Sequence, residues 1–157
     1  NEPIRGIKVK ISDVQLHEDP VHRGPAQIMP MTRRAFFAAF LSANPCLLEP
    51  IQKITVKIPS ELLGSVTSVI TQKRGKILSV EQREHLVYVV GEIPTSETFD
   101  LSEVMRSGTA GRAFWGLEFS HWSPLPASLM LQVIGEIRKR KGLPPEPHKP
   151  EDFIDKA

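Results

Sequence analysis

The stretch LLEPIQKITVKIPSELLGSVTSVITQKRGKIL, residues 47–78, decides the fold of this chain. Apolar and polar side chains alternate over residues 54–58, which predicts a half-buried β-strand. From Ser60, the expected N-cap, the apolar spacing becomes helical and continues to a glycine. Residues 76–80 then predict a short second strand. The stretch therefore opens a domain as strand, helix and strand.

The residues that follow extend this pattern. Residues 85–94 predict a longer strand rich in β-branched side chains, and residues 97–107 predict a second helix. A last strand over residues 112–119 is expected to place four side chains on one face: Ala113, Trp115, Leu117 and Phe119. The order β-α-β-β-α-β over residues 50–122 matches the ferredoxin-like motif, a four-stranded antiparallel sheet with both helices on one face. The predicted fold class is α+β.

The residues before this domain are too few to fold alone. Residues 6–16 alternate as a strand would, and a helix is expected over residues 31–43, after Pro30. About 45 residues cannot bury a core of their own. A further helix, over residues 127–141, has an apolar face formed by Met130, Val133, Ile134 and Ile137. We expect this last helix to pack against the first segment.

Composition limits the class of protein. The 157 residues are 40% hydrophobic and 24% charged, as in globular proteins. No apolar run is long enough to span a membrane, so no membrane partner is expected. The single cysteine, Cys46, excludes an internal disulfide and is expected to be buried, and it favours a reducing, cytoplasmic location. The chain enters a strand pattern soon after Asn1, which suggests that it starts inside a longer protein.

Basic residues cluster at two places, although the net charge is only +2. These clusters are TQKRGK (71–76) and EIRKRKG (136–142), and both permit phosphate contact. In the second cluster the cations lie in the last turn of a predicted helix, where they complement the helix dipole. We therefore favour a structural interpretation of the second cluster.

The loop LHEDPVHRGPAQ, residues 16–27, carries two histidines, two acids and an arginine between prolines. His17 and His22 are five residues apart rather than the four of a zinc-protease pair, and Pro20 blocks a helix between them. No nucleophile and no G-x-x-x-x-G-K-[ST] phosphate-binding sequence accompanies the loop. We therefore expect neither a metal nor catalysis here. The loop suits hydrogen bonding and stacking against folded RNA, and the alternative is a merely solvated turn.

Several stretches resemble the elongation factor 2 family, the ribosomal translocases of archaea and eukaryotes. SDVQLHEDPVHRGPAQIMP (12–30) resembles the tip of the family's fourth domain. Its hallmark Asp-x-x-His-Arg-Gly is carried by Asp19, His22, Arg23 and Gly24. LLEPIQKITVKIP, VTSVITQKRGKIL and GRAFWGLEFSHW resemble the fifth domain, and IRKRKGLPPEPHKPEDF resembles the C-terminal helix and tail. The prolines at positions 20 and 25 are similar to those of the archaeal branch.

This resemblance implies a domain organisation. Residues 1–48 would be the back half of a ribosomal protein S5 domain 2-like domain, with the diphthamide loop at 16–27. Residues 49–124 would be the ferredoxin-like fifth domain. Residues 125–157 would form a helix and tail that pack back on the fourth domain and complete it.

The resemblance also implies site residues. The histidine that matches His22 is converted to diphthamide in the family and is the target of ADP-ribosylating toxins. The tip enters the decoding site and holds the tRNA–mRNA duplex during translocation, with contacts implied for His17, Asp19, Val21, His22, Arg23 and Gly24. In the first basic cluster we expect ribosomal RNA contacts from Lys73, Arg74 and Lys76.

The implied partners are the ribosome, with its RNA and its tRNA–mRNA duplex, together with diphthamide-synthesis enzymes and ADP-ribosylating toxins. GTP and magnesium belong to the GTPase domain of the parent protein, so no cofactor and no enzymatic activity are expected of these 157 residues. Two alternatives are a related spliceosomal or ribosome-maturation GTPase and an unrelated RNA-binding ferredoxin-like module. The His22-Arg23-Gly24 tip disfavours the first. The second would require aromatic residues on its central strands, where HLVYVVGEI offers only Tyr88.

Overall fold

The computed structural model describes residues 2–154, which divide into two compact units. One unit is formed by residues 46–146. The other combines residues up to 45 with the tail from residue 147 onward. No helix among the described residues has both the length and the apolar character that a membrane crossing requires.

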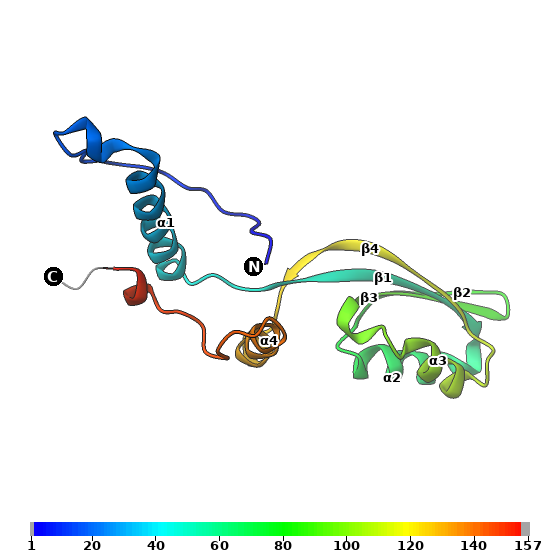
Figure 1. The fold of residues 1–157 in the computed structure, drawn as a ribbon. Helices are drawn as coiled ribbons and strands as arrows, with labels where there is room; N and C mark the ends of the chain where they lie inside the picture. Colours follow the sequence, from blue (N-terminus) through cyan, green and yellow to red (C-terminus); the bar gives the residue numbers. More distant parts are fainter. Residues whose placement is uncertain (1, 155–157) are drawn as a thin grey trace. The chain divides into compact units, whose positions relative to one another are not determined.

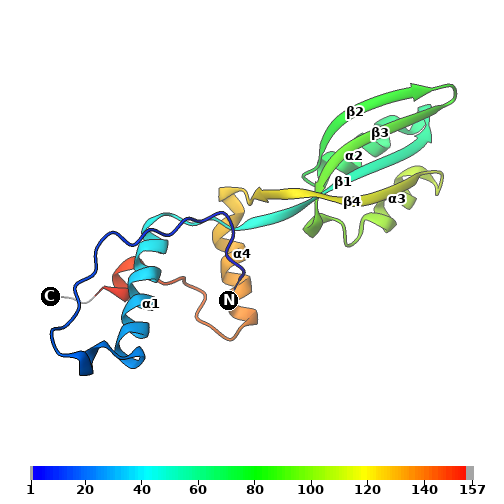
Figure 2. The ribbon, with the colours of Figure 1, turned by 90° about the horizontal axis from the view of Figure 1, so that it is seen from above.

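The larger unit is built on a four-stranded antiparallel sheet (Figures 1 and 2). Its strands, in the spatial order β2-β3-β1-β4, are β1 (Leu48–Pro59), β2 (Lys76–Arg83), β3 (Leu86–Pro94) and β4 (Phe114–Pro124). Two helices cover one face of this sheet, α2 (Leu63–Gln72) and α3 (Leu101–Thr109). The predicted ferredoxin-like α+β fold is therefore confirmed for this unit.

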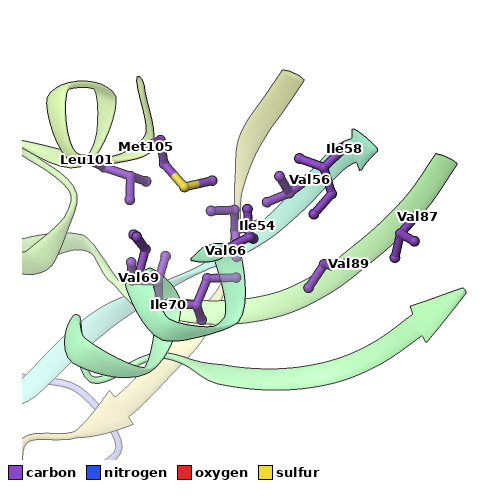
Figure 3. Close-up of a cluster of buried hydrophobic side chains, with 11 residues drawn as sticks. Ile54, Val56, Ile58, Val66, Val69, Ile70, Val87, Val89, Leu101 and Met105 are labelled. Carbon is purple, nitrogen blue, oxygen red and sulfur yellow. The ribbon is translucent and has the colours of Figure 1, made fainter. Parts of the chain in front are cut away.

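The core of this unit lies between the sheet and the two helices (Figure 3). Ile54, Val56 and Ile58 alternate along β1 with their side chains fully buried. They meet fully buried residues of both helices, among them Val66, Ile70, Leu101 and Met105. Since burial of one such side chain contributes about 1.5–3 kcal/mol, this apolar face holds the helices on the sheet.

Two local expectations in this unit were wrong, those for Ser60 and Cys46. Ser60 does not cap α2, because it begins a short 3₁₀ helix, η2 (Ser60–Leu62), that precedes the α-helix. Phe119 shares the face of Leu117, as predicted, because the two pair with Gln52 and Ile54, but at 59% exposure it lies outside the core cluster. Cys46 is exposed rather than buried, because it lies in the connection before β1.

Helix α4 (Ala127–Arg140) also belongs to the larger unit. It follows Leu125, whose backbone N–H donates to the carbonyl of Leu47 at 2.8 Å. The N–H of Leu47 in turn contacts Sδ of Met130 at 3.3 Å. None of the α4 side chains is fully buried. The expectation that this helix packs on residues 31–43 or 7–16, and so completes the domain of the first segment, stays a prediction.

The smaller unit contains helix α1 (Pro25–Ser42) and two 3₁₀ helices, η1 (Pro20–Arg23) and η4 (Pro150–Phe153). Helix α1 begins six residues before the predicted range of 31–43, because Pro25 provides a proline at the first helical position. Pro30 is accommodated inside the helix. The tail helix η4 packs on α1, with the rings of Phe153 and Phe37 5.3 Å apart.

Residues 6–16 do not form the predicted strand. They run as an extended segment with no strand pairing among the described residues. The alternating side chains of Ile7, Val9 and Ile11 are 46%, 61% and 74% exposed. An alternating sequence becomes a strand only when a neighbouring strand accepts its backbone hydrogen bonds.

Candidate functional site

The loop at residues 16–27 is folded back on itself by its own polar groups. The Asp19 carboxylate accepts a hydrogen bond from the Val21 N–H at 2.9 Å and so caps η1. The His22 N–H donates to the Asp19 carbonyl at 3.1 Å. Pro20, at the first position of η1, has a ring that presets the backbone for this turn. Asp19 therefore organises the turn that presents His22.

Arg23 closes the loop from its other end. Its Nε donates to the carbonyl of His17 at 2.6 Å, and its Nη2 donates to the carbonyl of Glu18 at 2.7 Å. Both acceptors are backbone oxygens that would otherwise depend on water. The planar guanidinium can reach two neighbouring carbonyls at once, whereas a lysine ammonium lacks this rigid fork.

The two histidines of the loop lie together. The rings of His17 and His22 are 4.6 Å apart at an interplanar angle of 63°. Nδ1 of His17 accepts a hydrogen bond from the Asp19 N–H at 3.0 Å. That nitrogen carries no proton in this arrangement, so a neutral His17 holds its proton on Nε2. His17 thus supports the turn and lies beside His22.

The structure brings together all six residues predicted for decoding-site contact. Five of them, His17, Asp19, Val21, His22 and Arg23, are exposed, and Gly24 is half-buried at the start of α1. Within residues 2–154 no group of histidine, cysteine, aspartate or glutamate side chains is arranged to hold a metal ion. Such a surface can recognise a large partner by contact. Its role in decoding stays a prediction.

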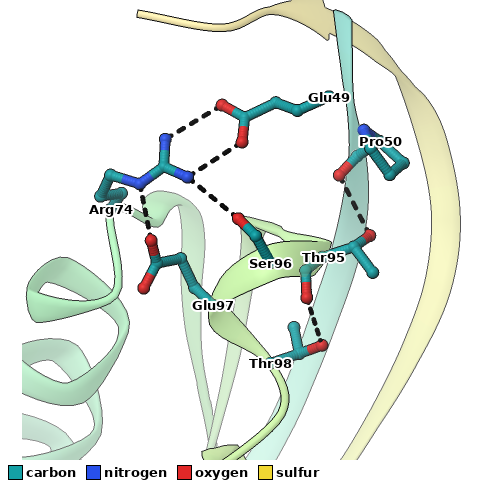
Figure 4. A network of polar contacts seen from close by, with 7 residues as sticks. All are labelled: Glu49, Pro50, Arg74, Thr95, Ser96, Glu97 and Thr98. Carbon is teal, nitrogen blue, oxygen red and sulfur yellow. Dashed lines mark hydrogen bonds and ion pairs between the residues drawn. The ribbon is translucent and has the colours of Figure 1, made fainter. Parts of the chain in front are cut away.

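The first basic cluster has a different environment. Arg74 lies in the left-handed region (φ 55°) after α2, and its guanidinium bridges Glu49 and Glu97 (Figure 4). The hydrogen bonds to Glu49, and then the one to Glu97, raise the pKa of Arg74 above its ordinary value. Ser96 accepts a further hydrogen bond from Arg74 at 3.1 Å. The guanidinium therefore makes its described hydrogen bonds to other residues of the same unit.

The two lysines of the first basic cluster, Lys73 and Lys76, differ in their ion pairing. Lys73 forms an ion pair with Asp100 at 2.5 Å. This contact lowers the pKa of the Asp100 carboxyl. Lys76, at the start of β2, has no ion pair with another residue of the described chain. Of the three predicted ribosomal RNA contacts, Lys76 therefore has the freest charge, and all three stay predictions.

Sequence reasoning missed the network around Arg74. Its members come from β1, from the turn after α2 and from η3 (Thr95–Glu97), and they are separated by more than 20 residues. Thr95 of the same segment donates to the carbonyl of Pro50 at 3.0 Å, which ties η3 to β1 (Figure 4). The signal in the sequence was one arginine in a basic run, and nothing local identified its acidic partners.

Comparison with protein families matches almost the whole chain. The family model of the Elongation factor G C-terminus matches residues 46–133, and that of Elongation factor G, domain IV, matches residues 1–44. The boundary between the two matches coincides with the boundary between the two structural units, at residues 45 and 46.

Individual relatives give the same result. The chain is 56% identical over 153 residues to Elongation factor 2 of Staphylothermus marinus and 54% identical over 154 residues to that of Saccharolobus solfataricus. Each alignment covers 98% of this chain and 21% of the relative, so the chain spans about a fifth of their length. A crystal structure from Thermus thermophilus is similar with a TM-score of 0.56 and 35% identity, over 58% of this chain and 14% of that one.

Proposed function

Since this chain belongs to the elongation factor family that includes elongation factor G and elongation factor 2, we propose that it is the C-terminal part of a GTP-dependent ribosomal translocase. In this proposal the loop at 16–27 enters the decoding site and holds the tRNA–mRNA duplex as it moves. The partners are ribosomal RNA and the tRNA–mRNA duplex, and the place of action is the cytoplasm.

The observation that carries this proposal is the internal order of the exposed loop. Asp19 and Arg23 hold the backbone through hydrogen bonds within the loop, while the His22 side chain remains at the surface. A loop that is ordered before it binds loses less conformational entropy on contact. An ordered tip can transfer force to the tRNA–mRNA duplex, whereas a flexible tip would deform instead.

The proposal gives His22 a specific role. Its exposed imidazole is accessible to modifying enzymes, and its described ring contact is with His17 alone. Diphthamide at this position would extend the side chain and add a cation and an amide. These groups would contact phosphates and base edges, so their contribution is positioning of the duplex rather than chemistry. The same exposure would make the residue accessible to ADP-ribosylating toxins.

GTP and magnesium do not fit the residues of this chain. Its 157 residues contain no G-x-x-x-x-G-K-[ST] sequence, and the part that the structure describes holds no cluster of acids suited to a metal. We propose that GTP is bound and hydrolysed by the remaining length of the protein. No step of that reaction is assigned to residues of this chain.

The test compares two exposed histidines in the full-length factor. His22→Ala should abolish ADP-ribosylation by diphtheria toxin and increase frame slippage during translocation, while ribosome-stimulated GTP hydrolysis continues. His85→Ala, in the exposed turn between β2 and β3, makes the same chemical change and should alter neither property. ADP-ribosylation of the His22→Ala protein at the wild-type rate would show that His22 is the wrong residue. If His22→Ala leaves the frequency of frame slippage unchanged, the proposed role of His22 in the decoding site is wrong.

A further inference from the structure

The sheet of the larger unit has a second face, which α2 and α3 do not cover (Figure 1). Residues that pair directly across antiparallel strands point to the same face, so the strand register defines rows of neighbours. One row on the uncovered face crosses all four strands: Glu81, Tyr88, Lys57 and Phe114. The row beside it consists of Ser79, Val90, Thr55 and Gly116.

The first row places a cation between two aromatic rings. Lys57 pairs with Tyr88 on one side and with Phe114 on the other. Nζ of Lys57 lies 5.8 Å from the centre of the Tyr88 ring, and Cζ of Arg83 lies 5.1 Å from it. Since adjacent strands are about 4.8 Å apart, the two aromatic residues are separated by about 10 Å across the sheet. We call Tyr88, Lys57 and Phe114 the aromatic row.

Phe114 is an unusual residue to leave uncovered. Its side chain is 75% exposed, although its neighbours Ala113 and Trp115 pack against the core on the opposite face. Burial of a phenylalanine side chain contributes about 1.5–3 kcal/mol to stability, and the exposed Phe114 ring does not make this contribution. A ring held at the surface by a well-packed strand is available for a partner.

Open space lies beside the Phe114 ring. Gly116 follows two positions later on β4 and faces the same way, and a Cβ added there would meet no atom within 4 Å. Thr55, opposite Gly116, is small and exposed. The surface over Gly116 and Thr55 is therefore open to a planar group beside the aromatic row.

The charges of this face favour an anionic partner at the aromatic row. A third row alternates in sign, Lys76, Glu92, Lys53 and Glu118, and its one described ion pair joins Lys53 to Glu118 at 3.0 Å. Arg83 is paired with Glu81 at 2.8 Å. Lys57 has no ion pair with any residue of the described chain. The uncompensated cation of the aromatic row thus lies between its two rings.

We propose that the aromatic row is a binding platform for unpaired RNA, on which Phe114 and Tyr88 stack bases and Lys57 contacts a phosphate. Sequence-tolerant RNA-binding sheets combine these two elements, aromatic stacking and a cation along the backbone. A wholly apolar protein partner would leave the Lys57 ammonium buried without a counter-charge. The platform involves no residue of the 16–27 loop, so it stands independently of the proposed function.

The platform could not be predicted from the sequence, because its members come from three different strands. Tyr88 is the single aromatic residue of β3, and Phe114 lies 26 positions further along the chain. The RNA-recognition pattern of several aromatic residues within one strand is absent from β3. The register of β1 with both of its neighbours assembles an equivalent set of side chains.

The experiment measures binding of the 157-residue chain to a labelled, unstructured 12-nucleotide RNA and to the same sequence as a duplex. The starting protein carries His22→Ala and Arg23→Ala, so that the loop does not contribute. We expect binding to the single strand and weaker binding to the duplex. Phe114→Ala or Tyr88→Ala should weaken single-strand binding about tenfold, since one stacked base is worth about 1–3 kcal/mol. Lys57→Gln should reduce the logarithmic salt dependence by about 0.7.

Two further variants separate binding from folding. Phe99→Ala removes a phenylalanine that is 88% exposed and lies outside the sheet, and it should bind RNA as the starting protein does. Gly116→Val fills the open space beside Phe114 with a residue favourable in strands, so it should keep the fold and lose single-strand binding. Thermal unfolding checks each variant.

Four results would overturn the proposal. They are equal binding to duplex and single strand, loss of all binding in the loop-substituted protein, equal effects of Phe99→Ala and Phe114→Ala, and unchanged binding by Gly116→Val. The third result would instead indicate a non-specific apolar contact.

Discussion

Arg74 donates hydrogen bonds to both carboxylate oxygens of Glu49, from Nη1 at 3.0 Å and from Nη2 at 2.9 Å. Its Nε donates to Glu97 at 2.8 Å. The side chains of Arg74 and Glu49 are 28% and 12% exposed, so water screens this pair only partly. One guanidinium thereby joins the start of β1, the turn after α2 and the segment before α3.

Arg74→Ala should lower the free energy of unfolding of the larger unit by roughly 2 kcal/mol. The substitution leaves the largely buried Glu49 carboxylate without its partner, and hydrogen bonds to charged groups contribute about 1.5–3 kcal/mol. Denaturant unfolding measures the change. Arg83→Ala, which removes an exposed arginine paired with the exposed Glu81, is the control and should leave the unfolding midpoint unchanged. Equal effects of the two substitutions would show that the Arg74–Glu49 pair stabilises the unit no more than the exposed Arg83–Glu81 pair does.

Gly75→Ala should destabilise the same unit by more than about 2 kcal/mol. A Cβ at position 75 would lie 2.6 Å from both the Cγ2 and the carbonyl oxygen of Ile70, and 2.9 Å from the carbonyl oxygen of Glu92. Two of these atoms belong to the backbone, which cannot move without breaking the packing of α2. Gly116→Ala meets no atom within 4 Å and should be neutral or stabilising by about 0.5 kcal/mol. A lower melting temperature for Gly116→Ala than for Gly75→Ala would contradict the predicted clash.

Asp19→Ala should loosen the tip of the 16–27 loop without unfolding α1. The Val21 N–H loses its acceptor, so its hydrogen exchange should accelerate, and that of His22 should follow as the turn opens. Asp19→Asn retains an acceptor oxygen at the same position and should preserve the protection. The amides of the later turns of α1 serve as an internal reference. If Asp19→Ala and Asp19→Asn exchange alike, the cap does not order the loop.

Phe153→Ala should release the tail from α1. The Phe153 ring contacts both Phe37 and His148, at 5.3 and 5.4 Å, and anchors η4. Hydrogen exchange should then increase over residues 149–154 and at the α1 turn around Phe37. Ile154→Ala, which truncates the adjacent side chain that is 55% exposed, should leave both regions protected. Unchanged protection with Phe153→Ala would mean that other contacts dock the tail.

Acid should loosen the same tail through Asp152. Its carboxylate accepts from the Lys149 N–H at 2.9 Å, and this bond, followed by the contact with His148, lowers the pKa of Asp152 below its ordinary value of 3.8. A group with a lowered pKa stabilises the folded form above its unfolded pKa, and this contribution disappears as the pH falls through the folded pKa. The Lys149 amide signal should therefore shift as the pH falls below about 4. Asp152→Asn should abolish that shift.

The sequence predicted what depends on local spacing and missed what depends on a distant partner. Ile54, Val56 and Ile58 revealed β1 because alternation itself records a buried face. Ile7, Val9 and Ile11 show the same alternation, yet no neighbouring strand within the described residues pairs with them. A strand needs hydrogen-bonding neighbours as well as a pattern.

The candidate sites divide in the same way. The 16–27 loop was predictable because its contacts span only a few residues: Asp19 accepts from the Val21 N–H, and Arg23 donates to the His17 carbonyl. Arg74 is held by Glu49 and Glu97, more than 20 positions away, which no local pattern indicated, and its expected contact with RNA stays a prediction. Only the strand register brings Phe114 and Tyr88 to the two sides of Lys57.

Both tryptophans of the chain, Trp115 and Trp122, lie on β4 in the larger unit. Intrinsic fluorescence excited at the indole band therefore reports on this unit alone, whereas far-ultraviolet circular dichroism sums the helices of both. If the two optical signals give different melting temperatures, the units unfold as separate cooperative systems. Coincident transitions would show that the chain melts as one. Because Trp115 packs against the core on the side of β4 opposite Phe114, its emission should respond to unfolding far more than to a ligand on the exposed face.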